Sequence, residues 1–228
     1  MPIVVPFSDA QPIVGVLEPE DREIKGLVAP PPSPPGTYVA LGAITTTPLT
    51  AQTAGLDPQL AQEMAADAVN RYYHVRFSCT FHPSGNATFE KAWVLGNLSA
   101  DGDEAAPIAL SLDPLRADHA VEITQGFELG VDFKFLSAKG SDEVKMPTSL
   151  IFVEALNEGL SDPSWEFTQT AAQRLSGLQR LQLIVRTGKK GGHGAITLLA
   201  NVARKEGLLG GTYRARFGQQ PSVTFDLT

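Results

Sequence analysis

The sequence predicts a mainly β protein: an antiparallel, jelly roll-like β-sandwich with one clear short helix near residues 57–70. Two observations support this fold class. Apolar and polar residues alternate with period two through several segments, which is the pattern of half-buried strands. These segments recur about every ten residues with turn-forming residues between them, as in sandwiches and barrels.

Length and composition divide the chain into an arm and a single domain. We predict an extended, Pro-rich N-terminal arm over residues 1–36 and one β-sandwich domain over residues 37–228. The arm ends in PPPSPP at residues 30–35, and such a run is a stiff, extended spacer. A chain of 228 residues buries enough surface for a core without a staple, and its one cysteine allows no internal disulfide.

The first elements of the domain are a strand and the helix. Residues Tyr38–Thr47 are rich in β-branched side chains and predict a strand. In LDPQLAQEMAADAV, Asp57 can cap the helix and Pro58 suits its first turn. The helical spacing places three apolar residues on one face: Leu60, Met64 and Ala68.

The segment RYYHVRFSCTFHP, residues 71–83, combines residue types that are common in active sites with strict alternation. One face would carry Tyr73, Val75, Phe77, Cys79 and Phe81. The other would carry Tyr72, His74, Arg76, Ser78, Thr80 and His82. The two histidines are eight residues apart, about 26 Å along a strand, so they cannot share a metal ion. We expect a buried thiol at Cys79 and a polar side that faces solvent or a partner.

The remaining strands follow at similar intervals. In ATFEKAWVLGNL, residues 87–98, Phe89 and Trp93 are in phase and should share a face. Further strands are expected at Ala106–Leu112, Ala120–Gln125, Val131–Leu136, Leu150–Leu156, Trp165–Thr168, Leu181–Arg186, Ala195–Val202, Thr212–Phe217 and Val223–Leu227.

No motif for catalysis or metal binding is present. The chain has no HExxH, paired CxxC or GxSxG. Asp101, Asp103 and Glu104 resemble the start of a calcium loop, but the closing Glu is missing, so a solvated hairpin tip is favoured. We therefore expect a non-enzyme without cofactor or metal. A hydrolase whose residues converge only in three dimensions stays open, and a pocket joining His119 or His193 to carboxylates would indicate it.

Charge is distributed unevenly along the chain. Residues 174–216 hold nine basic residues and one acid, net +8, so the remainder of this −7 chain is net −15. The split predicts a basic surface for a nucleic acid or an acidic protein face. Strand parity and the turn TGKKGGHG indicate the side chains that would contact an anionic partner: Arg180, Arg186, Lys189, Lys190, His193, Arg214 and Arg216. A solvated face that balances the acidic remainder is the alternative.

The order of elements resembles a known family. An apolar strand ends in Phe81, His82 and Pro83, a second strand carries Ala92 to Val94, and a late hairpin runs from LQRLQLIVRT to AITLLANVA. Over residues 30–205 this layout resembles the single jelly-roll coat proteins of small icosahedral RNA viruses, notably the tymovirus-like group. The resemblance implies a sandwich that assembles into a shell, an arm that crosses subunit boundaries, and no catalysis. The arm departs from the basic RNA-packaging arms of many such coats, because acidic residues outnumber basic ones in it.

Two functions follow as expectations. The first is a structural, self-assembling, capsid-like subunit whose partners are copies of itself. The alternative is a cytosolic β-sandwich recognition module that binds a carbohydrate, peptide or nucleic acid through loops such as Gly188–Gly194. The N-terminus lacks a signal-peptide pattern and no run approaches a membrane span, so we expect a cytoplasmic or virion location and no membrane partner.

Overall fold

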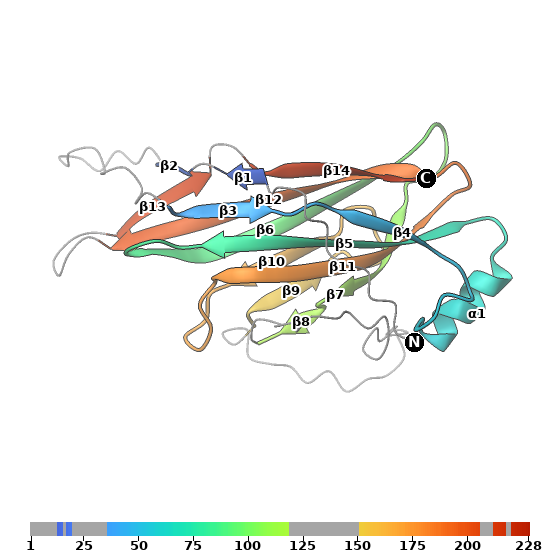
Figure 1. Cartoon of the computed structure of the whole chain (residues 1–228), viewed down its shortest axis with the longest axis horizontal. Coiled ribbons are helices and arrows are strands. Elements are labelled where there is room, and N and C mark those ends of the chain that lie inside the picture. Colours follow the sequence, from blue (N-terminus) through green and yellow to red (C-terminus); the bar gives the residue numbers. More distant parts are fainter. Residues whose placement is uncertain (1–12, 16, 20–35, 119–150, 206–211, 218–219) are drawn as a thin grey trace.

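The computed structural model describes residues 13–15, 17–19, 36–118, 151–205, 212–217 and 220–228. Two antiparallel sheets pack face to face, with one helix at the end of the sandwich (Figure 1). The six-stranded sheet has the order β1 (Ile13–Gly15), β3 (Tyr38–Leu41), β5 (Arg71–His82), β11 (Gly177–Thr187) and β7 (Ile108–Asp113), with β4 (Thr45–Leu49) also paired to β5.

The eight-stranded sheet is the second layer. Its order is β2 (Leu17–Pro19), β13 (Thr212–Phe217), β12 (Gly192–Lys205), β6 (Ala87–Ala100), β10 (Ser164–Thr168), β9 (Val153–Leu156) and β8 (Arg116–Ala117), with β14 (Ser222–Leu227) also paired to β12. Strands that follow one another in the chain cross between the two sheets about as often as they stay in one, as in β5–β6–β7 and β10–β11–β12. The predicted antiparallel β-sandwich is therefore confirmed.

The predicted helix is also confirmed, as α1 (Pro58–Ala66). Asp57 Oδ1 accepts hydrogen bonds from the backbone nitrogens of Gln59, at 2.8 Å, and Leu60, at 3.2 Å. These bonds satisfy two of the amides that a helix start leaves without partners. Leu60 and Met64 are buried, so the helix packs through the predicted apolar face.

The core lies between the sheets and includes the whole predicted inner face of β5. Tyr73, Val75, Phe77, Cys79 and Phe81 are at most 2% exposed, and Cys79 is a free thiol. Aromatic rings from both layers meet there. The Phe77 and Trp165 rings contact edge to face at 5.8 Å, which is a favourable geometry for a ring pair.

The expectation for the outer face of β5 is wrong over half of its length. Tyr72, His74 and Arg76 are 6%, 1% and 3% exposed, whereas His82 is exposed. Part of the reason is α1, which packs on this face and forms a second apolar cluster of Leu49, Leu60, Met64, Tyr72 and Ile184. Alternation sorts side chains between faces, but it does not reveal that another element covers the outer one.

The shared face expected for Phe89 and Trp93 is also wrong. Phe89 is fully buried, while Trp93 is half-buried on the outer side of the eight-stranded sheet. The register between β12 and β6 shifts at Asn201 and Val202, so Asn201 pairs with Lys91 and Val202 with Phe89. This β-bulge at Glu90 adds one residue and reverses the phase of β6.

Part of the predicted arm pairs with the domain. β1 lies against β3 in the six-stranded sheet, and β2 lies against β13 in the eight-stranded sheet. The rest of residues 1–35, the strands expected at 120–125 and 131–136, and His119 lie outside the described residues.

Candidate functional site

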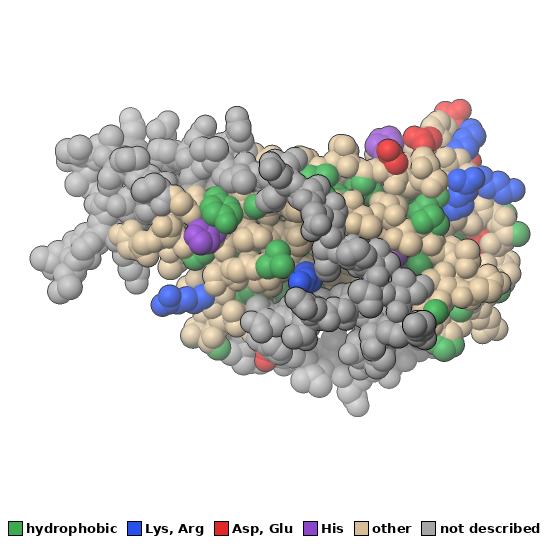
Figure 2. Space-filling model, in the orientation of Figure 1, with side chains coloured by type: hydrophobic (Ala, Val, Ile, Leu, Met, Phe, Trp, Pro, Cys, Tyr) green, Lys and Arg blue, Asp and Glu red, His purple; other side chains and the backbone are tan. Residues whose placement is uncertain are grey.

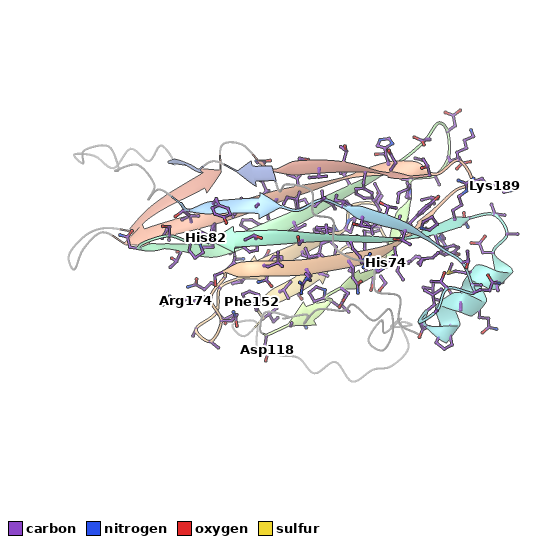
Figure 3. The ribbon with its side chains drawn as sticks, in the orientation of Figure 1. His74, His82, Asp118, Phe152, Arg174 and Lys189 are labelled. Carbon is purple, nitrogen blue, oxygen red and sulfur yellow. The ribbon has the colours of Figure 1, made fainter. Side chains whose placement is uncertain are left out.

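The predicted basic contacts are divided between the two layers of the sandwich. Arg180 and Arg186 lie on β11 in the six-stranded sheet, and Arg214 and Arg216 lie on β13 in the eight-stranded sheet. Lys189 lies at the α1 end of the molecule, whereas Arg174 lies at the opposite end (Figure 3). The net positive segment therefore does not form one continuous basic face.

Acidic residues lie beside the basic turn between β11 and β12. The backbone nitrogen of Lys190 donates to Glu104 Oε2 at 3.2 Å, and His193 Nδ1 lies 3.4 Å from Asp101 Oδ1. Both acids belong to the predicted hairpin tip between β6 and β7. Figure 2 shows acidic and basic side chains gathered together at this end of the molecule. The structure thus brings His193 to one carboxylate, in an exposed pair rather than in a pocket.

Arg186 and Lys189 line an open hollow of about 450 Å³ beside this turn. We call it the Arg186 hollow. Its walls come from the connection between α1 and β5, the β6–β7 connection with the first residue of β7, and the end of β11 with the turn after it: Val69, Asn70, Glu104, Ala105, Ala106, Ile108, Arg186, Thr187, Gly188 and Lys189. Among the described residues, the ion pairs involve neither Arg186 nor Lys189.

A hydrogen-bonded group holds one wall of the hollow. Asp67 Oδ1 accepts from the backbone nitrogens of Val69 and Asn70, and Asp67 Oδ2 accepts from Asn70 Nδ2 and the Tyr72 hydroxyl, both at 2.7 Å. These bonds, first among them that from the Asn70 side chain, lower the pKa of Asp67 well below its usual range. The Asp67 carboxylate therefore stays charged and fixes Asn70 at the rim.

Tyr72 connects this group to Arg186. Burial, followed by the hydrogen bond to Asp67 and its charge, raises the pKa of Tyr72 to about 12, while the Arg186 guanidinium acts in the opposite direction. Tyr72 therefore stays a neutral donor to Asp67 with Arg186 beside it. Tyr72 lines a second open hollow of about 500 Å³, which lies between β4, α1 and the start of β5 and shares Asn70 with the Arg186 hollow.

A buried polar chain crosses three strands on the outer face of the six-stranded sheet. His74 Nε2 lies 2.7 Å from Gln182 Oε1, and Gln182 Nε2 donates to Asp113 Oδ2 at 2.8 Å. Burial, aided by the charge of Arg76, lowers the pKa of His74 to about 4 against the opposing effect of Gln182. Cys79 points to the opposite face, where burial raises the pKa of its thiol. His74 and Cys79 therefore do not meet, and the chain joins strands rather than placing a nucleophile beside a base.

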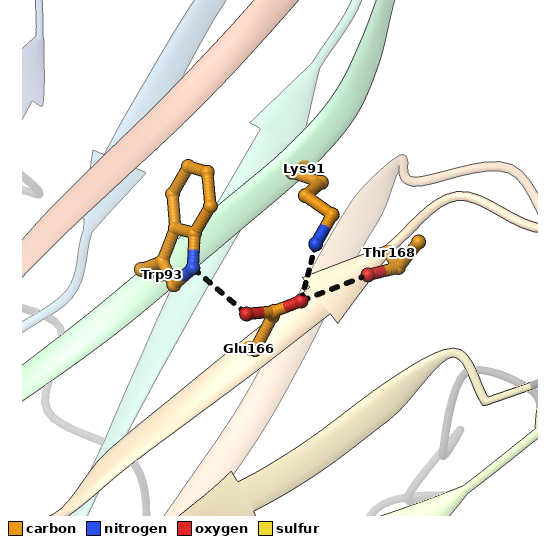
Figure 4. A network of polar contacts seen from close by, with 4 residues as sticks. All are labelled: Lys91, Trp93, Glu166 and Thr168. Atoms are coloured by element: carbon orange, nitrogen blue, oxygen red, sulfur yellow. Dashed lines mark hydrogen bonds and ion pairs between the residues drawn. The ribbon is translucent and has the colours of Figure 1, made fainter. Parts of the chain in front are cut away.

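The outer face of the eight-stranded sheet carries a group that the sequence did not reveal. Glu166 Oε1 accepts from Lys91 Nζ at 2.6 Å and from Thr168 Oγ1 at 3.5 Å, while Glu166 Oε2 accepts from Trp93 Nε1 at 3.1 Å (Figure 4). The Lys91 bond is the main cause of a lowered pKa at Glu166. The alternation of residues in β6 did not predict this group, because it does not show the β-bulge that turns Trp93 outward.

Apolar side chains surround this group. Leu199 pairs with Trp93 across β12 and β6, and Leu95 and Leu156 flank Ser164 from the two sides. Leu95 is 39% exposed and Leu156 is 44% exposed. We call this surface the Trp93 face, made of Lys91, Trp93, Leu95, Leu156, Glu166 and Leu199.

Two further features bear on the predicted classes. Within the described ranges, no group of three or more His, Cys, Asp or Glu side chains could hold a metal ion. No helix in the same ranges is long and apolar enough to cross a membrane. The fold defines a β-sandwich protein, and the Arg186 hollow and the Trp93 face are two surface features of it. No protein-family model matches the chain, and no curated protein matches it.

Proposed function

We propose that the protein is a structural, self-assembling subunit, a coat-like β-sandwich that packs against copies of itself in a shell or large oligomer. The observation that carries this proposal is the Trp93 face. It is a sheet surface of tryptophan and leucine side chains that no described element covers. Exposed leucines beside a half-buried tryptophan on one sheet face suit contact with another protein surface.

The composition of the Trp93 face suits contact with another protein. Tryptophan is enriched among the residues that contribute most to binding at interfaces. Around Trp93, the Lys91–Glu166 and Arg116–Glu154 ion pairs supply both signs of charge. A surface that carries both signs in equal number can pair with its own copy about a two-fold axis, where each cation faces an anion.

The size of the purified protein tests this proposal. We expect the full chain to form large, regular particles by light scattering and electron microscopy. The double variant Leu95→Lys, Leu156→Lys should shift the protein toward monomers, because it places charges where apolar contacts form. The matched control is Leu178→Lys, which changes a leucine of 49% exposure on the other sheet and should leave the particles intact.

Two outcomes would contradict the proposal. A monomeric wild-type chain at high concentration would refute self-assembly itself. Particles that survive the Leu95 and Leu156 changes but are lost in Leu178→Lys would assign assembly to the six-stranded sheet instead. Circular dichroism of each variant shows that the sandwich is folded before the comparison is made.

The second candidate function is a recognition module that binds its partner through the loops at the α1 end. The Arg186 hollow favours it, since two cations line a concave surface there. This function predicts a monomer or dimer that binds a polyanionic probe such as heparin. Changing Lys189 and Lys190 together to alanine should weaken that binding, and unchanged affinity would exclude the turn as the binding surface.

A further inference from the structure

We propose that the Arg186 hollow binds a single carboxylate group attached to a small aliphatic body. The inference deepens the second candidate function, the recognition module, and rests on it. It is carried by three features of the hollow: the balance of its charges, the support of Arg186, and the apolar side chains at its rim.

The balance of charges favours one negative charge. Arg186 and Lys189 contribute two positive charges, and Glu104 contributes one negative charge to the same lining. Glu104 is held in place, because its Oε2 accepts from the backbone nitrogen of Lys190 and its carboxylate lies directly against Gly188. The lining therefore has a net charge of +1, which matches one carboxylate better than a doubly charged phosphate.

Arg186 is positioned to act as the anchor. Arg186 is a half-buried residue beside Tyr72, whose hydroxyl is already used as a donor to Asp67. One of its donors is directed to the Tyr72 hydroxyl. Among the described residues no carboxylate forms an ion pair with Arg186, so its other planar donors can bind a ligand. A guanidinium can bind a carboxylate through two parallel hydrogen bonds, a geometry that the ammonium of Lys189 cannot reproduce.

The rim of the hollow supplies apolar contacts. Val69 is 58% exposed, and Ile108, Ala105 and Ala106 line the same space. A volume of about 450 Å³ accommodates a small organic acid. The hollow therefore combines a cationic anchor with a short apolar surface, and this pairing selects an aliphatic carboxylate.

The test is a titration of the full chain, followed by NMR, with N-acetylleucine near neutral pH. The matched probe is N-acetylleucinamide, which has the same shape without the charge. We expect millimolar binding of the acid and at least about tenfold weaker binding of the amide. Inorganic phosphate should bind more weakly than the acid. Equal binding of acid and amide, or tighter binding of phosphate, would overturn the inference.

Variants locate the site. Arg186→Gln should weaken binding of the acid about tenfold or more, and Arg186→Lys should restore only part of it. Arg180→Gln is the matched control, because Arg180 lies on the same strand and outside the hollow, and it should bind as the wild type does. Unchanged binding in Arg186→Gln, with the fold intact, would contradict the assignment.

The failure of this inference can be separated from that of the recognition module. If heparin binding depends on Lys189 and Lys190 but N-acetylleucine does not bind, the module stands and the carboxylate site is refuted. If neither probe binds, both are refuted. N-acetylglycylleucine adds one residue behind the same carboxylate. Tighter binding of this probe assigns the site to a peptide C-terminus, and equal binding assigns it to a free acid.

Discussion

His74 Nε2 and Gln182 Oε1 lie 2.7 Å apart on adjacent strands, in a part of the sheet where both side chains are buried. Because Gln182 Nε2 must donate to the Asp113 carboxylate at 2.8 Å, its carbonyl oxygen faces His74. The Nε2 atom of the neutral imidazole therefore carries the hydrogen. One chain of donors and acceptors thus connects β5, β11 and β7 across the outer face of the six-stranded sheet.

Stability should fall in mild acid because of His74. Its pKa is lowered from 6.5 to about 4 by burial, so below pH 6.5 the unfolded chain binds a proton that the folded chain does not. The free energy of unfolding should therefore decrease by roughly 3 kcal/mol as the pH falls from 6.5 to about 4. Urea unfolding across this range measures the effect.

The variant His74→Gln isolates this contribution, since an amide does not titrate. Its stability should depend less on pH than that of the wild type over the same range. His82→Gln removes an exposed histidine from the same strand, stacked on Tyr38 at 4.8 Å, and serves as the control. An identical pH dependence in His74→Gln and wild type would show that the fold does not lower the pKa of His74.

Gln182→Leu should be more destabilising than its size suggests. The change leaves the buried His74 nitrogen without its acceptor and removes one donor to Asp113. We expect a loss of about 2–4 kcal/mol in the free energy of unfolding, measured in urea. Gln179→Leu is the matched control on the same strand, because the hydrogen bond of the Gln179 side chain within the described residues is a 3.3 Å bond to the Ser176 carbonyl. Equal losses in the two variants would show that the polar chain contributes nothing specific.

Much of the fold could be predicted because its signals are local. Asp57 and Pro58 mark the start of α1, and alternation placed the inner side chains of β5, such as Phe77, in the core. The failures have non-local causes. The covering of Tyr72 depends on α1 packing back onto the sheet, and the position of Trp93 depends on a bulge against β12. Neither cause can be recognised from the sequence of β5 or β6 alone.

The candidate site was harder to predict for the same reason. The basic turn was found from its composition, but its contact with Glu104 joins positions 86 residues apart. Parity on β11 and β13 placed arginines on outward positions of each strand, and only the topology shows that the two strands belong to different sheets. No sequence pattern indicated Asn70, at the rim of the Arg186 hollow, because it lies in a connection without a motif.

Cys79 should react with thiol reagents only when the chain unfolds. The side chain is fully buried between the sheets, and burial raises the pKa of its thiol, so the reactive thiolate is suppressed in the fold. Labelling with Ellman's reagent should be negligible in native buffer and should accelerate as urea populates the unfolded chain. Complete labelling within minutes in native buffer would mean that the core opens locally around β5.

Asp67→Asn should lower the pKa of Tyr72 from about 12 toward its ordinary value of 10. Burial is the largest cause of the raised pKa and persists in the variant, so the pKa should stay above 10. What the variant removes is the carboxylate that accepts the Tyr72 hydroxyl at 2.7 Å and repels the phenolate. A pH titration followed by the near-ultraviolet absorbance of phenolate measures this pKa, and subtracting the titration of Tyr72→Phe isolates the contribution of Tyr72.

The same change should alter stability in alkali. Above pH 10 the unfolded chain loses the Tyr72 proton while the folded chain keeps it, so stability falls as the pH rises toward 12. In Asp67→Asn this alkaline loss should be smaller. Asp57→Asn is the control, because it changes a carboxylate at the other end of α1 that caps the helix. A Tyr72 pKa that is unchanged in Asp67→Asn would show that burial alone sets it, and that Asp67 does not link α1 to the wall of the Arg186 hollow.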